Sequence, residues 1–229
     1  YFLKIKEKRI TALAMEYLQS EDGSFPIVRI MSEMAGVVAL QTAAEYLNNT
    51  NGGRGVMLGG VSGVPPAKVV ILGAGVVGEF ATKAAVNLGA SVRIFDNDIT
   101  KLMRLQSAVG RQLHTSAINP VYLGYQLMSA DVVIGAMHSK HGRTPILVTE
   151  EMVSKMKEGS VIIDVSIDQG GCIETEEADR RQPIHGLVHG RGIRALWRRK
   201  QADRGSVQLC YGYALLLARG VGIGSEDHR

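Results

Sequence analysis

Short apolar runs alternate with helical patterns along most of the chain. Short runs bounded by Gly or charged residues are typical of buried strands. They occur at 68–72, 91–95, 131–136 and 160–165, and residues 114–118 are a possible further strand. Helical patterns fill 76–88, 99–109, 121–128 and 150–156 between them. This alternation predicts βαβ units, and therefore a parallel sheet with helices on both faces.

The region before these units predicts one more helix. Ser32 is a suitable N-cap for a helix from Glu33 to about Leu47, and the polar, Gly-rich segment 48–53 would end it. Residues 1–30 resemble the end of another unit and its connection, which we expect Phe25-Pro26 to terminate. The chain begins at Tyr1 without Met, and we expect it to start inside a longer protein.

Composition is that of a soluble globular protein, with 45% hydrophobic and 21% charged residues. No apolar run is long enough to suggest a membrane span, so we expect no membrane partner. The two cysteines, Cys172 and Cys210, form no metal-binding pattern. We expect free thiols in a reducing cytoplasm and no metal site.

A glycine-rich motif follows the first of the predicted strands and opens the helix after it. Its residues are Gly73-Ala74-Gly75-Val76-Val77-Gly78. In a dinucleotide-binding turn, the first Gly makes the bend, the second lets the backbone approach the pyrophosphate, and the third lets helix and strand pack closely. The pyrophosphate would lie at the helix N-terminus. Glycines also serve ordinary tight turns, which is the alternative.

An acidic residue in the expected place strengthens the motif. Asp96 ends the second predicted strand, where a carboxylate can accept both adenosine ribose hydroxyls and repel a 2′-phosphate. We therefore expect NAD rather than NADP, unless Asp96 is only a surface residue beside a turn. Lys101 either reaches the same ribose or is a solvated helix residue. The fold class is α/β, a Rossmann-type doubly wound parallel sheet over residues 31–177, with remnants of a second substrate domain.

Four blocks of sequence resemble the alanine dehydrogenase and pyridine nucleotide transhydrogenase family, and the resemblance runs from about Thr11 to Glu174. Ile167-Asp168-Gln169-Gly170-Gly171 resembles the alanine dehydrogenase branch, because transhydrogenase NAD subunits carry a non-acidic pattern there. The blocks are 31–36, 52–64, 73–78 and 161–171.

The resemblance implies NAD-dependent oxidative deamination of L-alanine to pyruvate and ammonium. It makes Asp168 the active-site acid, placed to orient the attacking water or the amine, whereas a turn-forming Asp is the alternative. It makes Ser32 a contact of the cofactor phosphates, although a plain N-cap would serve equally. Met137, His138 and Ile167 would lie on the nicotinamide side, and His138 departs from the common family pattern.

The resemblance also implies that much of the substrate site is missing. The family's substrate domain lies mostly before Tyr1, and its carboxylate-binding Arg and Lys and its acid–base His have no matching position here. We therefore expect a cofactor-binding fragment of a cytoplasmic homo-oligomer, a hexamer by resemblance. The alternatives are the NAD(H)-binding subunit of a proton-translocating transhydrogenase and a non-catalytic NAD-binding module.

The last segment, residues 178–229, differs from the rest. Residues 180–229 contain 10 Lys and Arg residues but only three Asp and Glu residues, and the resemblance stops after about Thr175. Our hypothesis is an out-of-frame or wrongly joined end. A basic nucleic-acid-binding tail and a solvated tail are alternatives, but no nucleic-acid-binding motif accompanies the arginines, so we expect no nucleic-acid partner.

Overall fold

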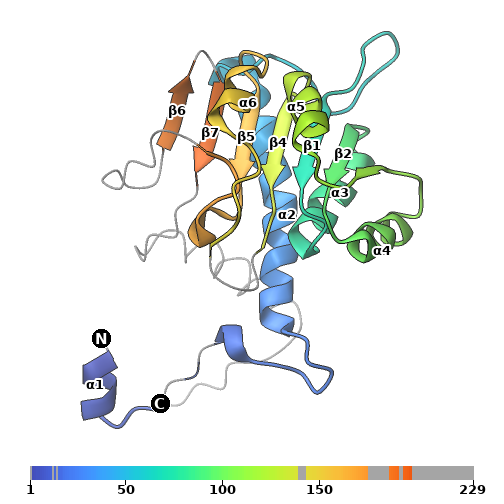
Figure 1. The fold of residues 1–229 in the computed structure, drawn as a ribbon. Helices are drawn as coiled ribbons and strands as arrows, with labels where there is room; N and C mark the ends of the chain where they lie inside the picture. The colour runs from blue at the N-terminus through green and yellow to red at the C-terminus, as the bar shows by residue number, and fades with distance from the viewer. Residues whose placement is uncertain are drawn as a thin grey trace, which may run out of the picture.

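The computed structural model describes residues 2–11, 13, 15–138, 143–174, 186–190 and 193–197. Its centre is a seven-stranded sheet with the order β3-β2-β1-β4-β5-β7-β6 (Figure 1). The strands are β1 (Lys68–Leu72), β2 (Ser91–Phe95), β3 (His114–Ser116), β4 (Val132–Gly135), β5 (Val161–Asp164), β6 (Gly186–Gly190) and β7 (Ile193–Trp197). The helices are α1 (Phe2–Glu7), α2 (Pro26–Leu47), α3 (Val76–Asn87), α4 (Ile99–Val109), α5 (Pro120–Met128) and α6 (Glu150–Ser154).

The predicted α/β fold with a parallel sheet is confirmed. Strands β1 to β5 pair in parallel, as does β7 with β5, whereas β6 pairs antiparallel with β7. The chain builds outward from β1 through β2 to β3, and then returns to the other side of β1 for β4 and β5. This reversal between β1 and β4 creates the crevice at the carboxyl ends of the strands where ligands of such sheets bind.

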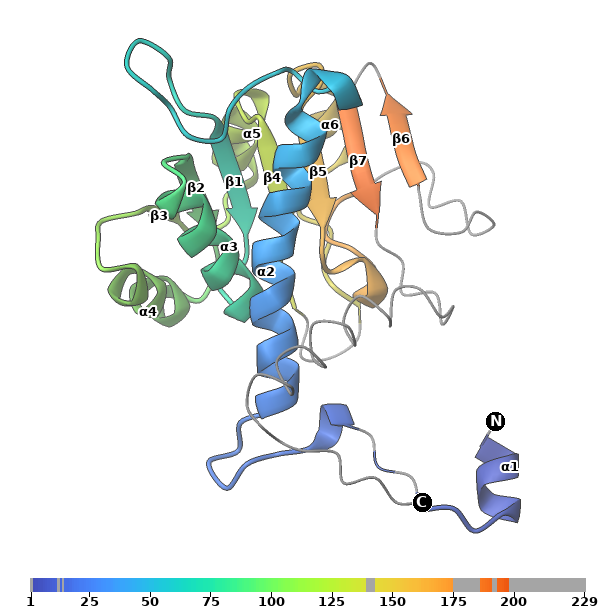
Figure 2. The ribbon, with the colours of Figure 1, turned by 180° about the vertical axis from the view of Figure 1, so that it is seen from behind.

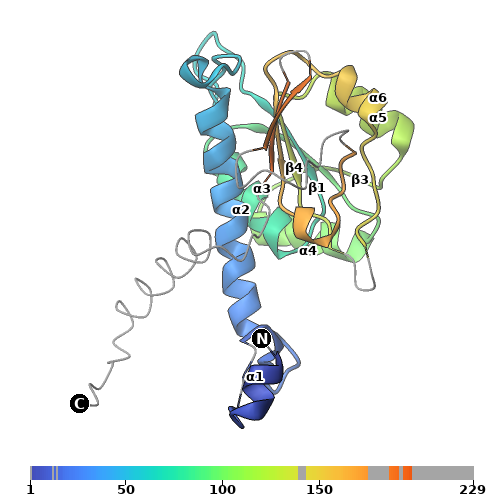
Figure 3. The ribbon, with the colours of Figure 1, turned by 90° about the vertical axis from the view of Figure 1, so that its left-hand side faces the viewer.

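Two apolar layers cover the two faces of the sheet. Helices α2, α3 and α4 pack on one face, over side chains such as Val69 and Ile71 of β1 (Figure 2). The alternate residues Val70 and Leu72 face the other layer, which includes Leu123 and Leu127 of α5. Figure 3 shows α2 on one side of the sheet and α5 and α6 on the other. Burial on both faces explains why the strands read as continuous apolar runs.

Helix α2 begins earlier than the sequence pattern predicted. Ser32 is not an N-cap, because the helix starts at Pro26 and Ser32 lies inside it. Proline suits the first turn, where its missing N–H would have no acceptor within the helix. Phe25-Pro26 therefore opens a helix, whereas we had expected it to close a segment. Helix α1 lies apart from the sheet (Figure 1).

Helix α2 is also the one described helix whose length and mean hydropathy would suit a membrane span. Its mean hydropathy is 1.3 over the most apolar window, and core helices of soluble proteins pass the same test. One face of it is buried, including Leu40, Ala43 and Leu47, and it packs along α3 and against β4 and β5. The expected absence of a membrane partner stays a prediction.

The expected domain boundaries at residues 30 and 177 stay predictions. Two described stretches beyond residue 177, β6 and β7, extend the same sheet from β5. The rest of the Arg-rich segment lies outside the described residues.

A charged network fastens the amino ends of the central strands. Asp131, just before β4, accepts the N–H of Lys68 at 2.8 Å and the Lys157 ammonium at 2.8 Å, and Arg54 lies 3.5 Å away. Burial, together with the nearby charges of Arg93 and Lys157, lowers the pKa of Lys68, while Asp131 opposes that shift. At the amino edge of the sheet, the buried Asp131 carboxylate therefore has both hydrogen-bond donors and positive charges as partners.

The closest approach of α2 and α3 generates a stability prediction. A Cβ on Gly36 would lie 2.8 Å from the Ala81 nitrogen and closer still to the Val77 carbonyl oxygen. We expect Gly36→Ala to destabilise the fold by about 1–3 kcal/mol, because the helices must move apart. The measurement is the free energy of unfolding in urea.

Gly124 in α5 is the matched control, because a Cβ there would meet nothing within 4 Å. Gly124→Ala should be neutral or stabilise by up to about 1 kcal/mol through helix propensity. If Gly36→Ala and Gly124→Ala change the free energy of unfolding by the same amount, the close packing of α2 on α3 is contradicted.

Candidate functional site

The glycine-rich motif forms the turn between β1 and α3 at the carboxyl edge of the sheet. Gly73 has a φ of +107°, and a Cβ there would lie 2.5 Å from the Ala136 carbonyl oxygen. A Cβ on Gly78 would collide with the carbonyl of Gly73, whereas a Cβ on Gly75 would meet nothing within 4 Å. Gly73 and Gly78 are thus required by the fold, and Gly75 faces open space that a ligand can approach.

Asp96 connects the end of β2 to this turn. One carboxylate oxygen accepts the N–H of Ala74 at 2.7 Å, and the other accepts the N–H of Asp98 at 2.8 Å. The residue is 4% exposed, so it is not the surface residue of the alternative interpretation. Each carboxylate oxygen has a second acceptor position, so Asp96 can hold the turn and still accept hydroxyl groups.

A cluster of charges surrounds the turn and was not predicted. Arg104 of α4 donates to the Ala74 carbonyl oxygen at 3.2 Å, so both sides of the Ala74 peptide group are held. The buried carboxylate of Glu79 pairs with Lys83 at 2.7 Å and with Arg104 at 3.8 Å. These two cations balance an acid that would otherwise oppose an anion at the start of α3. Long-range pairing of Arg104 with the turn has no signal in the sequence.

The structure places the other predicted contacts around the same edge. Lys101, half-buried, is in the first turn of α4, whose N-cap is Asp98. Ser32 is half-buried, one turn before Gly36, which adjoins the first turn of α3. Met137, half-buried, and His138, exposed, follow β4. Their contacts with a cofactor stay predictions.

The segment after β5 forms the turn that carries Asp168. Ile167–Gln169 is a 3-10 turn, closed by hydrogen bonds from Gln169 N–H and Gly171 N–H to the Ser166 carbonyl. The structure describes the backbone of Asp168, but its side chain lies outside what is described. The turn follows the strand next to β4, so Asp168 lies at the same edge of the sheet as the glycine turn.

Asp164, the last residue of β5, organises this turn and was not singled out from the sequence. It is 3% exposed and accepts the N–H of Ser166 at 2.9 Å, the Ser166 hydroxyl at 2.6 Å and the N–H of Cys172 at 2.8 Å. A signal existed: Asp164 ends a buried strand and precedes a turn, as Asp96 does.

Cys172 lies against this carboxylate. Its side chain is fully buried, with Sγ 3.9 Å from Asp164 Oδ1. Burial, followed by the negative charge of Asp164, raises the pKa of the Cys172 thiol to about 12. The thiol is therefore protonated at neutral pH and serves as a weak donor, in agreement with the expected free thiol.

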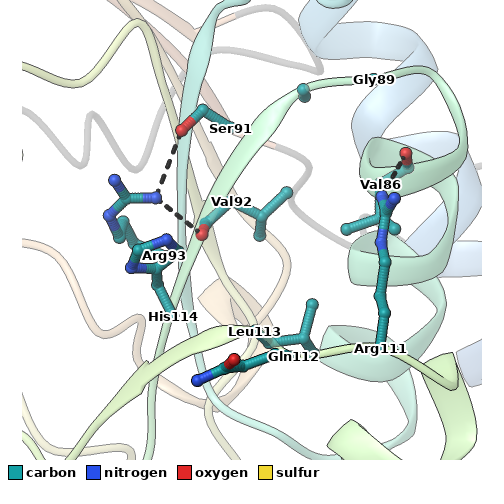
Figure 4. Close-up of a pocket in the computed structure, with 10 residues that line it drawn as sticks. Val86, Gly89, Ser91, Val92, Arg93, Arg111, Gln112, Leu113 and His114 are labelled. Carbon is teal, nitrogen blue, oxygen red and sulfur yellow. Dashed lines mark hydrogen bonds between the residues drawn. The ribbon is translucent and has the colours of Figure 1, made fainter.

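An open hollow of about 340 Å³ lies elsewhere, at the amino ends of β2 and β3 (Figure 4). Its two arginines are occupied by backbone carbonyls and a hydroxyl: Arg93 bonds Val92 and Ser91, and Arg111 bonds Val86. This hollow lies at the edge opposite the glycine turn, and we do not assign the site there.

Together, the carboxyl edge fits a dinucleotide. The start of α3 provides N–H groups without acceptors inside the helix, suited to a pyrophosphate. Asp96 provides an acceptor for ribose hydroxyls beside β1 and β2. The ends of β4 and β5 provide the second half of the crevice, where Met137 and Asp168 lie.

Comparisons with known proteins show which family this chain is similar to. The family model described as the C-terminal domain of alanine dehydrogenase/PNT matches residues 39–190, which extends past Thr175, where our sequence analysis places the end of the resemblance. Alanine dehydrogenase 2 of Staphylococcus aureus (strain USA300) is 42% identical over 188 residues, covering 80% of this chain and 50% of that protein. The chain thus spans about half the length of the curated relatives it matches.

Solved structures give the same result. An L-alanine dehydrogenase is similar with a TM-score of 0.77 and 36% identity, covering 97% of this chain and 63% of that one. A transhydrogenase from Sinorhizobium meliloti is similar with a TM-score of 0.60 and 28% identity, covering 74% of this chain and 47% of that one.

The environment of Cys172 generates a prediction about thiol reactivity. In a Cys210→Ser background, we expect a thiolate-directed reagent to label folded Cys172 at pH 8 about 1000-fold more slowly than an ordinary thiol. The thiolate population falls tenfold for each unit by which the pKa rises, here from 9.0 to about 12. The labelling rate should increase about tenfold per pH unit between pH 8 and 10.

The same protein in urea is the control, since unfolding removes both burial and the neighbouring carboxylate. Folded and unfolded protein that react at equal rates would contradict the buried, protonated thiol.

Proposed function

Since this chain belongs to the alanine dehydrogenase and pyridine nucleotide transhydrogenase family, as its C-terminal domain, we propose that it is the NAD-binding half of an NAD-dependent alanine dehydrogenase. The observation that carries this proposal is the buried Asp96 carboxylate held against the glycine turn, together with the acidic Asp168 after β5. The family implies a nicotinamide cofactor.

The site favours NAD(H) over NADP(H). Asp96 is buried, accepts two N–H groups and has acceptor positions left, so it can receive both hydroxyls of an adenosine ribose. A 2′-phosphate would place a second negative charge against this carboxylate in a buried setting, where repulsion is strong. The glycine turn Gly73 to Gly78 and the start of α3 would hold the pyrophosphate, and Ser32 and Lys101 would add contacts to the phosphates and the ribose.

The reaction we propose is the oxidative deamination of L-alanine to pyruvate and ammonium, with NAD supplying the hydride acceptor. Asp168 is the proposed catalytic acid, since a carboxylate at the carboxyl edge can orient the attacking water or the amine and balance an iminium charge. Ile167, Met137 and His138 would border the nicotinamide. A cytoplasmic location and a homo-oligomer, the hexamer of the resemblance, belong to this proposal for the whole protein.

Two assays on the same preparation test this function. Calorimetry with NADH and NADPH measures cofactor binding, and alanine-dependent reduction of NAD measures turnover. We expect NADH to bind. Turnover by this chain would mean that it holds a complete substrate site, whereas binding without turnover fits a cofactor-binding half. Absence of NADH binding would overturn the proposal.

A transhydrogenase NAD(H) subunit is the second candidate, favoured by the similarity to the Sinorhizobium meliloti structure. The acidic Ile-Asp-Gln turn supports the dehydrogenase instead. Hydride exchange between NADH and an NAD analogue that depends on an added NADP(H)-binding partner would favour the transhydrogenase.

The role of Asp96 generates a binding prediction. Asp96→Ala should weaken NADH binding about 10- to 100-fold, because charge-assisted hydrogen bonds to the ribose contribute about 1.5–3 kcal/mol. Affinity for NADPH should fall less, so the preference for NADH narrows. Calorimetry on both cofactors provides the measurement.

Asp98→Ala is the matched control, because Asp98 caps α4 without bonding the glycine turn. It should cost about 1 kcal/mol of stability and leave the ratio of the two affinities unchanged. If Asp96→Ala leaves both affinities unchanged, the ribose does not lie at Asp96.

A further inference from the structure

The carboxylate of Asp164 repeats the arrangement of Asp96 on the other half of the sheet. Asp96 follows β2 directly and Asp164 is the last residue of β5. In each, Oδ1 accepts the N–H of the residue two positions later, Asp98 or Ser166. Oδ2 accepts an N–H from another segment, at Ala74 or at Cys172. The two acids thus fix the two turns that border the crevice.

The two acids differ in how much acceptor capacity remains. Asp164 accepts a third strong donor, the Ser166 hydroxyl at 2.6 Å, and the Cys172 thiol lies 3.9 Å from the same oxygen. Neighbouring glycines complete the enclosure: a Cβ on Gly135 would lie 2.9 Å from Oδ1, and a Cβ on Gly171 3.0 Å from Oδ2. The Asp164 carboxylate therefore serves mainly protein donors, and its 3% exposure leaves little access for a ligand.

The bonds of Asp164 connect the two ends of one segment. Ser166 opens the turn and Cys172 closes it, so a single carboxylate sets the separation of these ends. From outside, Arg143 donates to the Gly170 carbonyl at 3.3 Å and the N–H of Thr144 donates to the Gln169 carbonyl at 2.9 Å. The backbone of residues 166–172 is thus held from both sides.

We propose that Asp164 is a positioning residue that fixes the Ile167–Gln169 turn, and with it Asp168, against the nicotinamide half of the cofactor site. This inference rests on the proposed function. Asp96 assigns the adenosine to the half of the sheet built by β1, β2 and β3. A dinucleotide that crosses the switch point must then place its nicotinamide over β4 and β5, where the turn lies.

The inference predicts a selective loss of binding. Asp164→Asn has nearly the same size, but its amide nitrogen must face the N–H of Ser166 or Cys172, so one of the two bonds is lost. We expect NADH to bind about tenfold more weakly to the variant. ADP-ribose, which lacks the nicotinamide, should bind within twofold of its affinity for the unchanged chain. Calorimetry with both compounds provides the measurement.

Asp131→Asn is the matched control at the opposite edge of the sheet. Asp131 is 6% exposed and also accepts a backbone N–H, from Lys68. Its replacement should lower the melting temperature and leave the ratio of NADH to ADP-ribose affinity unchanged. Equal loss of both ligands in Asp164→Asn would make Asp164 a purely structural residue and overturn the inference.

A double variant and hydrogen exchange test whether Asp164 acts through the turn. The double variant Asp164→Asn, Asp168→Asn should bind NADH no more weakly than the weaker-binding single variant, since both substitutions act on one contact. Hydrogen exchange without ligand should be faster in Asp164→Asn at the amide of Ser166 or at that of Cys172, whichever has lost its acceptor. If Asp164→Asn changes neither hydrogen exchange nor NADH affinity, the positioning role is refuted. If the chain without substitutions binds neither NADH nor ADP-ribose, the proposed function is overturned, and the inference with it.

Discussion

The carboxylate of Asp96 holds together the part of the molecule on which the proposed cofactor recognition depends. It accepts the N–H of Ala74 from the glycine turn and the N–H of Asp98 from its own segment, so β2, the turn and the start of α4 share one anchor. Arg104 holds the other side of the Ala74 peptide group. A turn fixed in this way keeps the first N–H groups of α3 aimed at the crevice before a ligand arrives, which lowers the cost of binding.

The charge balance of this region decides what can bind there. Two acids, Asp96 and Glu79, lie close to a helix N-terminus that is suited to an anion. Glu79 is neutralised by Lys83 and Arg104, and the charge of Asp96 is spread over two backbone donors. The pyrophosphate would therefore meet the helix dipole with little opposition, while a phosphate next to Asp96 would meet an unbalanced carboxylate. The proposed preference for NAD(H) over NADP(H) would then follow from which of the two acids is paired with a cation.

Much of the architecture and part of the site could be predicted from the sequence, for identifiable reasons. Strand β1 and the glycine turn have local signals, since apolar runs and glycine spacing report burial and close approach directly. The predicted start of α2 was wrong. Ser32 suits an N-cap when its local sequence is considered alone, but the helix begins six residues earlier at Pro26 and packs against α3. Arg104 and the Asp131 network could not be predicted, because they join residues far apart in the chain.

Buried acids anchor both edges of the sheet, but free helix N–H groups distinguish the edge at which we propose binding. At the amino edge, Asp131 takes up the N–H of Lys68 and the charges of Lys157 and Arg54. At the carboxyl edge, the N–H groups of Val76 and Val77 have no protein acceptor among the residues that the structure describes. The first N–H groups of a helix have no acceptor inside it, and at the start of α3 they open toward the crevice, where a pyrophosphate would accept from them. The proposed site therefore combines helix donors that the fold leaves free with a carboxylate, Asp96, whose acceptor capacity the fold uses only in part.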